Sequence, residues 1–78
     1  MTYEKLHTRV RNIHAIEDAI RRKIELDGKC SRIQAMQLGE KITELSMRTM
    51  KDYVETIERK GIFGSDGYYF VERKDDTI

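Results

Sequence analysis

Apolar residues recur every three or four positions in the first third of the chain, which is the spacing of one side of an α-helix. The members of this stripe are Tyr3, Leu6, Val10, Ile13, Ile20 and Ile24. Glu17 interrupts the stripe, and Ile16 and Ala19 widen it beside that interruption. We predict one helix over residues 3–26, about 35 Å long. A helix of this length is more than a small domain needs to cover its own core.

The start of this helix, residues 1–12, is therefore expected to extend past the core and to need a partner for its apolar side. The expected partner is a second copy of the chain, contacted through Tyr3, Leu6, Val10 and Ile13. Small size also favours a dimer, because a chain of this length buries only about two-thirds of its unfolded surface. The alternative is that the first turns fold back onto the same domain or fray.

A second helix is predicted over residues 31–43. Gly28 lies just past the first helix and can adopt the left-handed conformation that ends it. Ser31 and Gln34 have the spacing of a capping box. The expected buried side chains are Ile33, Met36, Leu38 and Ile42. Gly39 costs about 1 kcal/mol inside a helix relative to alanine, so we expect another helix to approach closely there.

The third predicted helix begins at the cap residue Ser46 and ends before Gly61. Its apolar residues are Met50, Val54 and Ile57. Their spacing of four and three places them on one side, opposite polar residues of both charges. The short connection before Ser46, with Leu45 as an apolar plug, makes the second and third helices a helix-turn-helix arrangement.

A short β-hairpin is predicted after the third helix. Its two strands are Ile62-Phe63 and Tyr68–Val71. The pair Asp66-Gly67 between them is a strong tight-turn signal. Alternation along the second strand would place Tyr68 and Phe70 inward and Tyr69 outward.

The predicted fold is therefore a mostly helical α+β domain spanning residues 1–78, with three helices followed by a short hairpin. Residues 73–78 are polar and are expected to form a loose tail. The chain has 78 residues, is 38% hydrophobic and 37% charged, and carries a formal net charge of +1. This near-neutral charge argues against a protein that binds nucleic acid through phosphates alone.

The remaining chemistry excludes several classes of function. Cys30 is the single cysteine, so neither an internal disulfide nor a cysteine zinc cluster is expected, and an intracellular, cytoplasmic setting follows. His7 and His14 lie about 10 Å apart along one helix, too far to share a metal within one chain. We find no catalytic constellation, signal peptide or membrane span. We therefore expect no enzyme activity, cofactor, metal or small-molecule ligand.

One segment of the chain resembles the winged helix-turn-helix family, and it reads Ser46-x-x-Thr49-Met50-x-x-x-Val54-x-x-Ile57-x-x-x-Gly61-Ile62-Phe63. The later residues Gly67-Tyr68-x-Phe70 resemble the return strand of the family's wing. The resemblance covers about residues 13–72. The chain departs from the family pattern by one extra residue in the turn before Ser46. Its wing is also short, and the tip residues Ser65 and Asp66 carry no positive charge.

The resemblance implies that the helix beginning at Ser46 enters the major groove of double-stranded DNA. Arg48 would pair with a guanine edge, and Asp52 or Glu55 would accept a hydrogen bond from cytosine. Lysine, arginine and hydroxyl side chains nearby, Lys29 among them, would contact phosphates. The residues expected at this interface are Arg32, Ser46, Met47, Arg48, Thr49, Lys51, Asp52 and Glu55.

The expected function is that of a small dimeric transcriptional regulator, encoded by a plasmid or virus and associated with the nucleoid when bound. Asp52, Glu55 and Glu58 leave a second interpretation open, because carboxylates along one helix repel phosphates unless they are paired. The same polar side would then be a solvated helix surface. In that case the chain would be a protein-interaction module, or an accessory subunit of a replication or recombination assembly.

Overall fold

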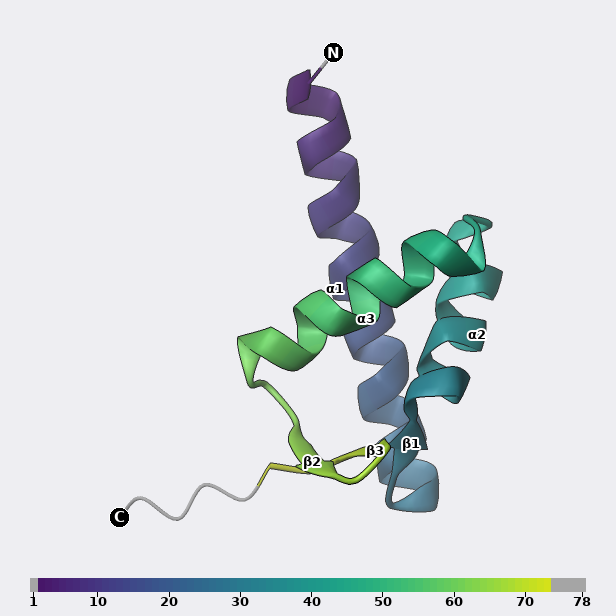
Figure 1. Ribbon diagram of the computed structural model, residues 1–78, viewed down its shortest axis with the longest axis vertical. Coiled ribbons are helices and arrows are strands. Elements are labelled where there is room, and N and C mark those ends of the chain that lie inside the picture. The colour runs from purple at the N-terminus through teal and green to yellow at the C-terminus, as the bar shows by residue number, and fades with distance from the viewer. Residues whose placement is uncertain (1, 74–78) are drawn as a thin grey trace.

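Three helices and a small antiparallel sheet make up the computed structural model of this chain (Figure 1). It describes the backbone of residues 2–73 and the side chains of residues 8–73. The elements are α1 Thr2–Asp27, β1 Cys30–Ser31, α2 Arg32–Thr43, α3 Met47–Lys60, β2 Gly64–Asp66 and β3 Tyr69–Val71. The predicted mostly helical α+β class is confirmed, and the order of elements is consistent with a winged helix. The predicted tail lies outside the described residues, apart from Arg73.

The helix α1 runs along the long axis of the molecule, and its N-terminal turns project beyond the other elements (Figure 1). From residue 13 onward its apolar stripe is buried, through Ile13, Ile16, Ile20 and Ile24. Glu17, the interruption of that stripe, is also buried, with 6% of its surface exposed. Its Oε2 accepts a hydrogen bond from Lys60 Nζ at 2.5 Å. The polar residue within the stripe therefore links α1 to the end of α3.

The start of α2 confirms the predicted turn and capping box. Gly28 has a φ of +85° and its N–H donates to the carbonyl of Ile24 at 2.7 Å, which ends α1. Ser31 Oγ accepts from the Gln34 N–H at 3.0 Å, and Gln34 Oε1 accepts from the Ser31 N–H at 3.0 Å. Two free donors of the helix end are thus satisfied by local side chains.

The buried side of α2 differs from the prediction. Ile33 and Ile42, both expected in the core, are 65% and 47% exposed. Met36 and Leu38, the other two predicted residues, are partly buried against the core, and the buried residues of α2 are Ala35 and Gly39. A Cβ built on Gly39 would lie only 2.5 Å from Met50 Sδ of α3. The close approach expected at Gly39 is confirmed, and it turns the small residues inward at the expense of the isoleucines.

The turn between α2 and α3 contains a strained residue. Glu44 has a φ of +59°, in the left-handed region that a side chain disfavours. Its N–H donates to the carbonyl of Glu40 at 2.8 Å, which closes the last turn of α2. Leu45 is half-buried and packs against the core, as predicted for the apolar plug. The chain then enters α3 at its cap residue Ser46.

The sheet contains a strand that periodicity did not predict. Its strand order is β1-β3-β2, with both pairs antiparallel. Cys30 of β1 lies opposite Phe70 of β3, and Ser31 lies opposite Tyr69. The last of the described strands therefore occupies the centre of the sheet. Phe70 is 2% exposed, which confirms its predicted inward position.

The hairpin is shifted toward the C-terminus relative to the prediction. Its first strand begins at Gly64 instead of Ile62, and Asp66 pairs with Tyr69. Gly67 and Tyr68 therefore form the two-residue turn, with Gly67 at a φ of +64°. Tyr68 is 80% exposed because it lies in this turn, so its predicted inward position is wrong.

Candidate nucleic-acid interface

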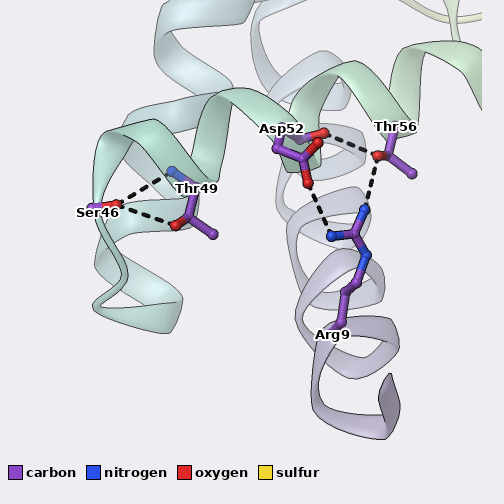
Figure 2. A network of polar contacts seen from close by, with 5 residues as sticks. All are labelled: Arg9, Ser46, Thr49, Asp52 and Thr56. Atoms are coloured by element: carbon purple, nitrogen blue, oxygen red, sulfur yellow. Dashed lines mark hydrogen bonds and ion pairs between the residues drawn. The ribbon is translucent and has the colours of Figure 1, made fainter. Parts of the chain in front are cut away.

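The geometry of α3 leaves one long side of the helix facing solvent. Ser46 Oγ accepts from the Thr49 N–H at 3.3 Å, and the hydroxyls of the two residues lie 3.2 Å apart (Figure 2). The helix ends at Gly61, which has a φ of +70°. Its buried residues are Met50, Tyr53, Val54 and Ile57. The opposite side of α3 is therefore the accessible one. In the view of Figure 1, α3 crosses in front of α1.

Four charged residues form the outermost row of this accessible side. Arg48, Asp52, Glu55 and Arg59 are separated by four, three and four positions, so they follow one another along the helix surface. All four are exposed, as is Lys51 beside them. Arg48, Lys51, Glu55 and Arg59 make no hydrogen bond or ion pair with another side chain among residues 8–73. These side chains are available to a ligand.

Arg59 is a member of this row that the sequence analysis did not place at the interface. It lies in the last turn of α3, where a positive charge also offsets the negative end of the helix dipole. The sequence does contain a signal for this placement. Arg59 lies four positions after Glu55 and eleven after Arg48, and eleven residues make close to three helical turns, so the three residues share one side of the helix.

Asp52 is paired with an arginine from α1. Arg9 Nη1 donates to Asp52 Oδ2 at 2.9 Å, and Arg9 Nη2 donates to Thr56 Oγ1 at 3.3 Å (Figure 2). The Arg9 guanidinium also lies over the ring of Tyr53, with its central carbon 5.2 Å from the ring centroid. The Asp52 side chain stays 58% exposed. One carboxylate along the accessible side is therefore compensated from within the chain.

Glu58, near the other end of the helix, is paired with Arg32 from the start of α2. Arg32 Nη1 also donates to the carbonyl of Gly67 in the hairpin turn, at 2.9 Å. The central carbon of the same guanidinium lies 5.6 Å from the centroid of the Phe70 ring. Arg32 is a predicted phosphate contact, and in this structure its charged group contacts α3, the hairpin turn and the ring of Phe70.

The hairpin adds little positive charge to this surface. Ser65 and Asp66 at its tip are exposed. Lys29, a further expected phosphate contact, holds its Nζ 4.3 Å from the centroid of the Tyr69 ring. The remaining predicted interface residues take part in the helix start: Ser46 caps it, and Met47 and Thr49 are half-buried.

The residues predicted at a dimer contact fall into three groups. Val10 is 48% exposed on α1, so its apolar side chain is accessible to a partner. Ile13 is 5% exposed and packs in the core of its own chain, so its surface is used internally. The side chains of Tyr3 and Leu6 lie outside the described part of the chain.

Comparison with protein-family models, with curated proteins and with solved structures finds no match to this chain. None of the helices described in the structure is both long and apolar enough to cross a membrane.

Proposed function

We propose that the chain is a sequence-specific double-stranded DNA-binding protein that reads the major groove with α3. The observation that carries this proposal is the compensation of acidic residues along the accessible side of the helix. Asp52 and Glu58 are paired with arginines from other elements. Glu55 is then the acidic residue left without a partner on this side among residues 8–73, and the basic residues Lys51 and Arg59 lie one helical turn before and after it. The objection that α3 would repel phosphates is therefore weakened.

The available side chains suit different parts of a DNA site. Arg48 near the start of α3 can donate two hydrogen bonds to the O6 and N7 atoms of guanine. Glu55, about two helical turns further along the same row, can accept from the amino group of cytosine. Lys51 and Arg59 flank this pair and can contact phosphates on the two sides of the groove. A helix of 14 residues is about 21 Å long and can follow the groove over this distance.

The projecting turns of α1 supply the second part of the proposal, which is a homodimer. Val10 of α1 is 48% exposed, and the N-terminal turns of this helix project beyond the other elements (Figure 1). A symmetric dimer would place two copies of α3 on half-sites about 10 base pairs apart, or a multiple of that spacing. Such a protein would act as a small transcriptional regulator. Sedimentation of the full chain and of a variant lacking residues 1–10 tests the dimer, because two monomers would exclude this contact.

The DNA proposal is tested by selecting bound sequences from a random duplex pool. The selected duplex and a scrambled control are then titrated by fluorescence anisotropy at low and at physiological salt. We expect the selected duplex to bind about a thousandfold more tightly than the control. The affinity for both should fall with salt, because phosphate contacts release counterions. Binding that ignores sequence, or no binding, would contradict the proposal.

A second candidate function is a protein-interaction module. The observation in its favour is an apolar surface beside the hairpin turn, where Ile33 is 65% exposed and Tyr68 is 80% exposed. The backbones of the two segments meet here, because the N–H of Arg32, the residue before Ile33, donates to the carbonyl of Tyr68 at 3.0 Å. Exposed apolar surface of this kind marks contacts with other proteins. Binding through it would be insensitive to salt, which distinguishes it from DNA binding.

A further inference from the structure

Arg9 connects the projecting helix α1 to the accessible side of α3, although 43 residues separate it from Asp52 in the sequence. Two of its nitrogens donate to two residues one turn apart on α3, at 2.9 Å to Asp52 and 3.3 Å to Thr56 (Figure 2). Its guanidinium rests over Tyr53, which is 7% exposed. These three residues lie on the flank of α3 that faces α1.

The partners of Arg9 are themselves held in place. Thr56 Oγ1 donates to the carbonyl of Asp52 at 2.9 Å, so its lone pair faces Arg9. The Tyr53 ring is fixed by the core beneath it. A planar guanidinium with two parallel donors loses little freedom in such a place, whereas a lysine would make one contact of adjustable direction. Arg9 is therefore a preorganised partner of the Asp52 carboxylate.

The Asp52 carboxylate occupies a sensitive position. It follows Arg48 by one helical turn in the outermost row of α3, and its side chain is 58% exposed. Without Arg9 it would present an uncompensated negative charge to any phosphate that approached this row. With Arg9 bound to Oδ2, the charge is offset and the carboxylate is held against the α1 flank of the helix.

We propose that Arg9 is a positioning residue for the DNA interface, which makes α3 compatible with a polyanion by neutralising and orienting Asp52. This role rests on the proposed function of α3 in DNA binding. Arg9 acts through Asp52 and need not touch DNA itself. The charge balance of the reading helix is thus set by a residue of α1, in a different part of the sequence.

The test compares R9Q, D52N and the double variant R9Q/D52N with the unmodified chain, using the selected duplex and its scrambled control. R9Q should weaken binding of both duplexes about fivefold, because it exposes the Asp52 charge. D52N should bind at least as well as the unmodified chain to the scrambled control. The double variant should recover the affinity of D52N to within about twofold, since no charge is then left to neutralise. Circular dichroism of every variant establishes that α1 and α3 remain folded.

Matched controls separate this role from the alternatives. R11Q removes the same charge from an exposed position on α1 and should leave binding nearly unchanged. R9K keeps the positive charge but can make only one contact of adjustable direction, so its affinity should fall between those of R9Q and the unmodified chain. A double variant that binds as weakly as R9Q would overturn the proposal and make Arg9 a direct phosphate contact or a purely structural link. R9Q with unchanged affinity would overturn it as well. An unmodified chain that binds no duplex would instead overturn the function of α3, and the role of Arg9 with it.

Discussion

Gly39 of α2 lies against Met50 of α3 so closely that a Cβ on the glycine would be 2.5 Å from the methionine sulfur. The same Cβ would be 3.1 Å from Cδ1 of Ile16 on α1. Both neighbours are fully buried. The three helices therefore approach one another at Gly39, where there is no room for a side chain. This close approach constrains the angle between α2 and α3.

Replacing Gly39 with alanine should lower the free energy of unfolding by about 1–2 kcal/mol, although alanine is the better helix former by about 1 kcal/mol. The cause is overpacking against Met50 and Ile16. Urea unfolding measures the effect. The double variant G39A/M50A should cost less than the sum of the two single changes, because truncating Met50 makes room for the new methyl group. Additive costs would show that the contact carries no strain.

Replacing Arg48 with alanine should cost about 1–3 kcal/mol of DNA-binding free energy and relax the preference at one base position. The reason is the loss of a paired contact with a guanine edge. Anisotropy titrations against duplexes changed one base pair at a time provide the measurement. R22A is the matched control, because Arg22 is exposed on α1 away from α3. An equal loss on every duplex would make Arg48 a phosphate contact instead.

Replacing Lys60 with methionine should destabilise the fold by about 2 kcal/mol, because it leaves the Glu17 carboxylate buried without its partner. The Glu17 side chain is 8% exposed and the Lys60 side chain is 38% exposed. Thermal and urea unfolding of K60M should be compared with K51M, which removes an exposed lysine from the same helix. The double variant E17L/K60M should recover much of the loss. Equal stability of K60M and K51M would argue against an energetic role for this pair.

Alkaline pH should destabilise the protein through Cys30. Burial raises the pKa of its thiol, an effect that the nearby charge of Lys23 partly offsets. The unfolded thiol ionises from about pH 8.5, so above that pH the unfolded chain binds fewer protons than the folded one. The contribution of Cys30 to stability is therefore complete below about pH 8.5. It is lost as the pH rises from there toward the pKa of the folded thiol. The slope is at most about 1.4 kcal/mol per pH unit.

Unfolding in urea at pH 7 and pH 9.5 measures this loss, and C30A is the control because it removes the thiol while the other groups still titrate. The unmodified chain should lose more stability between the two pH values than C30A does. Identical losses would mean that the thiol ionises equally well in both states.

The residues that end α2 and α3, Glu44 and Gly61, both adopt a positive φ. Introducing glycine at the first position and removing it at the second should therefore change the stability of the fold in opposite directions. Glu44 adopts a φ of +59° and Gly61 a φ of +70°. E44G should stabilise the fold by about 0.5–1 kcal/mol, since glycine reaches this conformation without steric cost. G61A should destabilise the fold by about 1 kcal/mol, because the Cβ of alanine makes the left-handed conformation unfavourable. Unfolding midpoints measured side by side provide the comparison, and a loss of stability in E44G would indicate that its side chain has a favourable role.

The helix ends were predictable because their signals are local. Ser31, Gln34, Ser46 and Gly61 act within a few residues of themselves, so each could be identified without knowledge of the fold. The strand β1 could not, because two residues are too short to show alternation. It exists only through pairing with residues about 40 positions later.

The buried side of α2 and the partners of α3 depend on packing between distant elements. Periodicity favoured Ile33 for the core, whereas the close approach at Gly39 turned that isoleucine outward. Charge patterning likewise identified Asp52 as a problem for a DNA-binding surface but could not reveal Arg9, its partner on another helix. The sequence thus predicted which side of α3 is accessible. The ion pairs of Asp52 and Glu58 could be identified only from the tertiary structure.

The order of strands in the sheet has a consequence for synthesis. β3 is synthesised after β1 and β2, yet it lies between them and is the strand that both of them pair with. Until Phe70 has been synthesised, Cys30 has no residue paired opposite it. The core residues that Phe70 covers in the folded protein then remain exposed. The helices can meet before β3 is synthesised, but the sheet can close only after it. A chain that is cut short before β3 would therefore present an open core to chaperones and proteases.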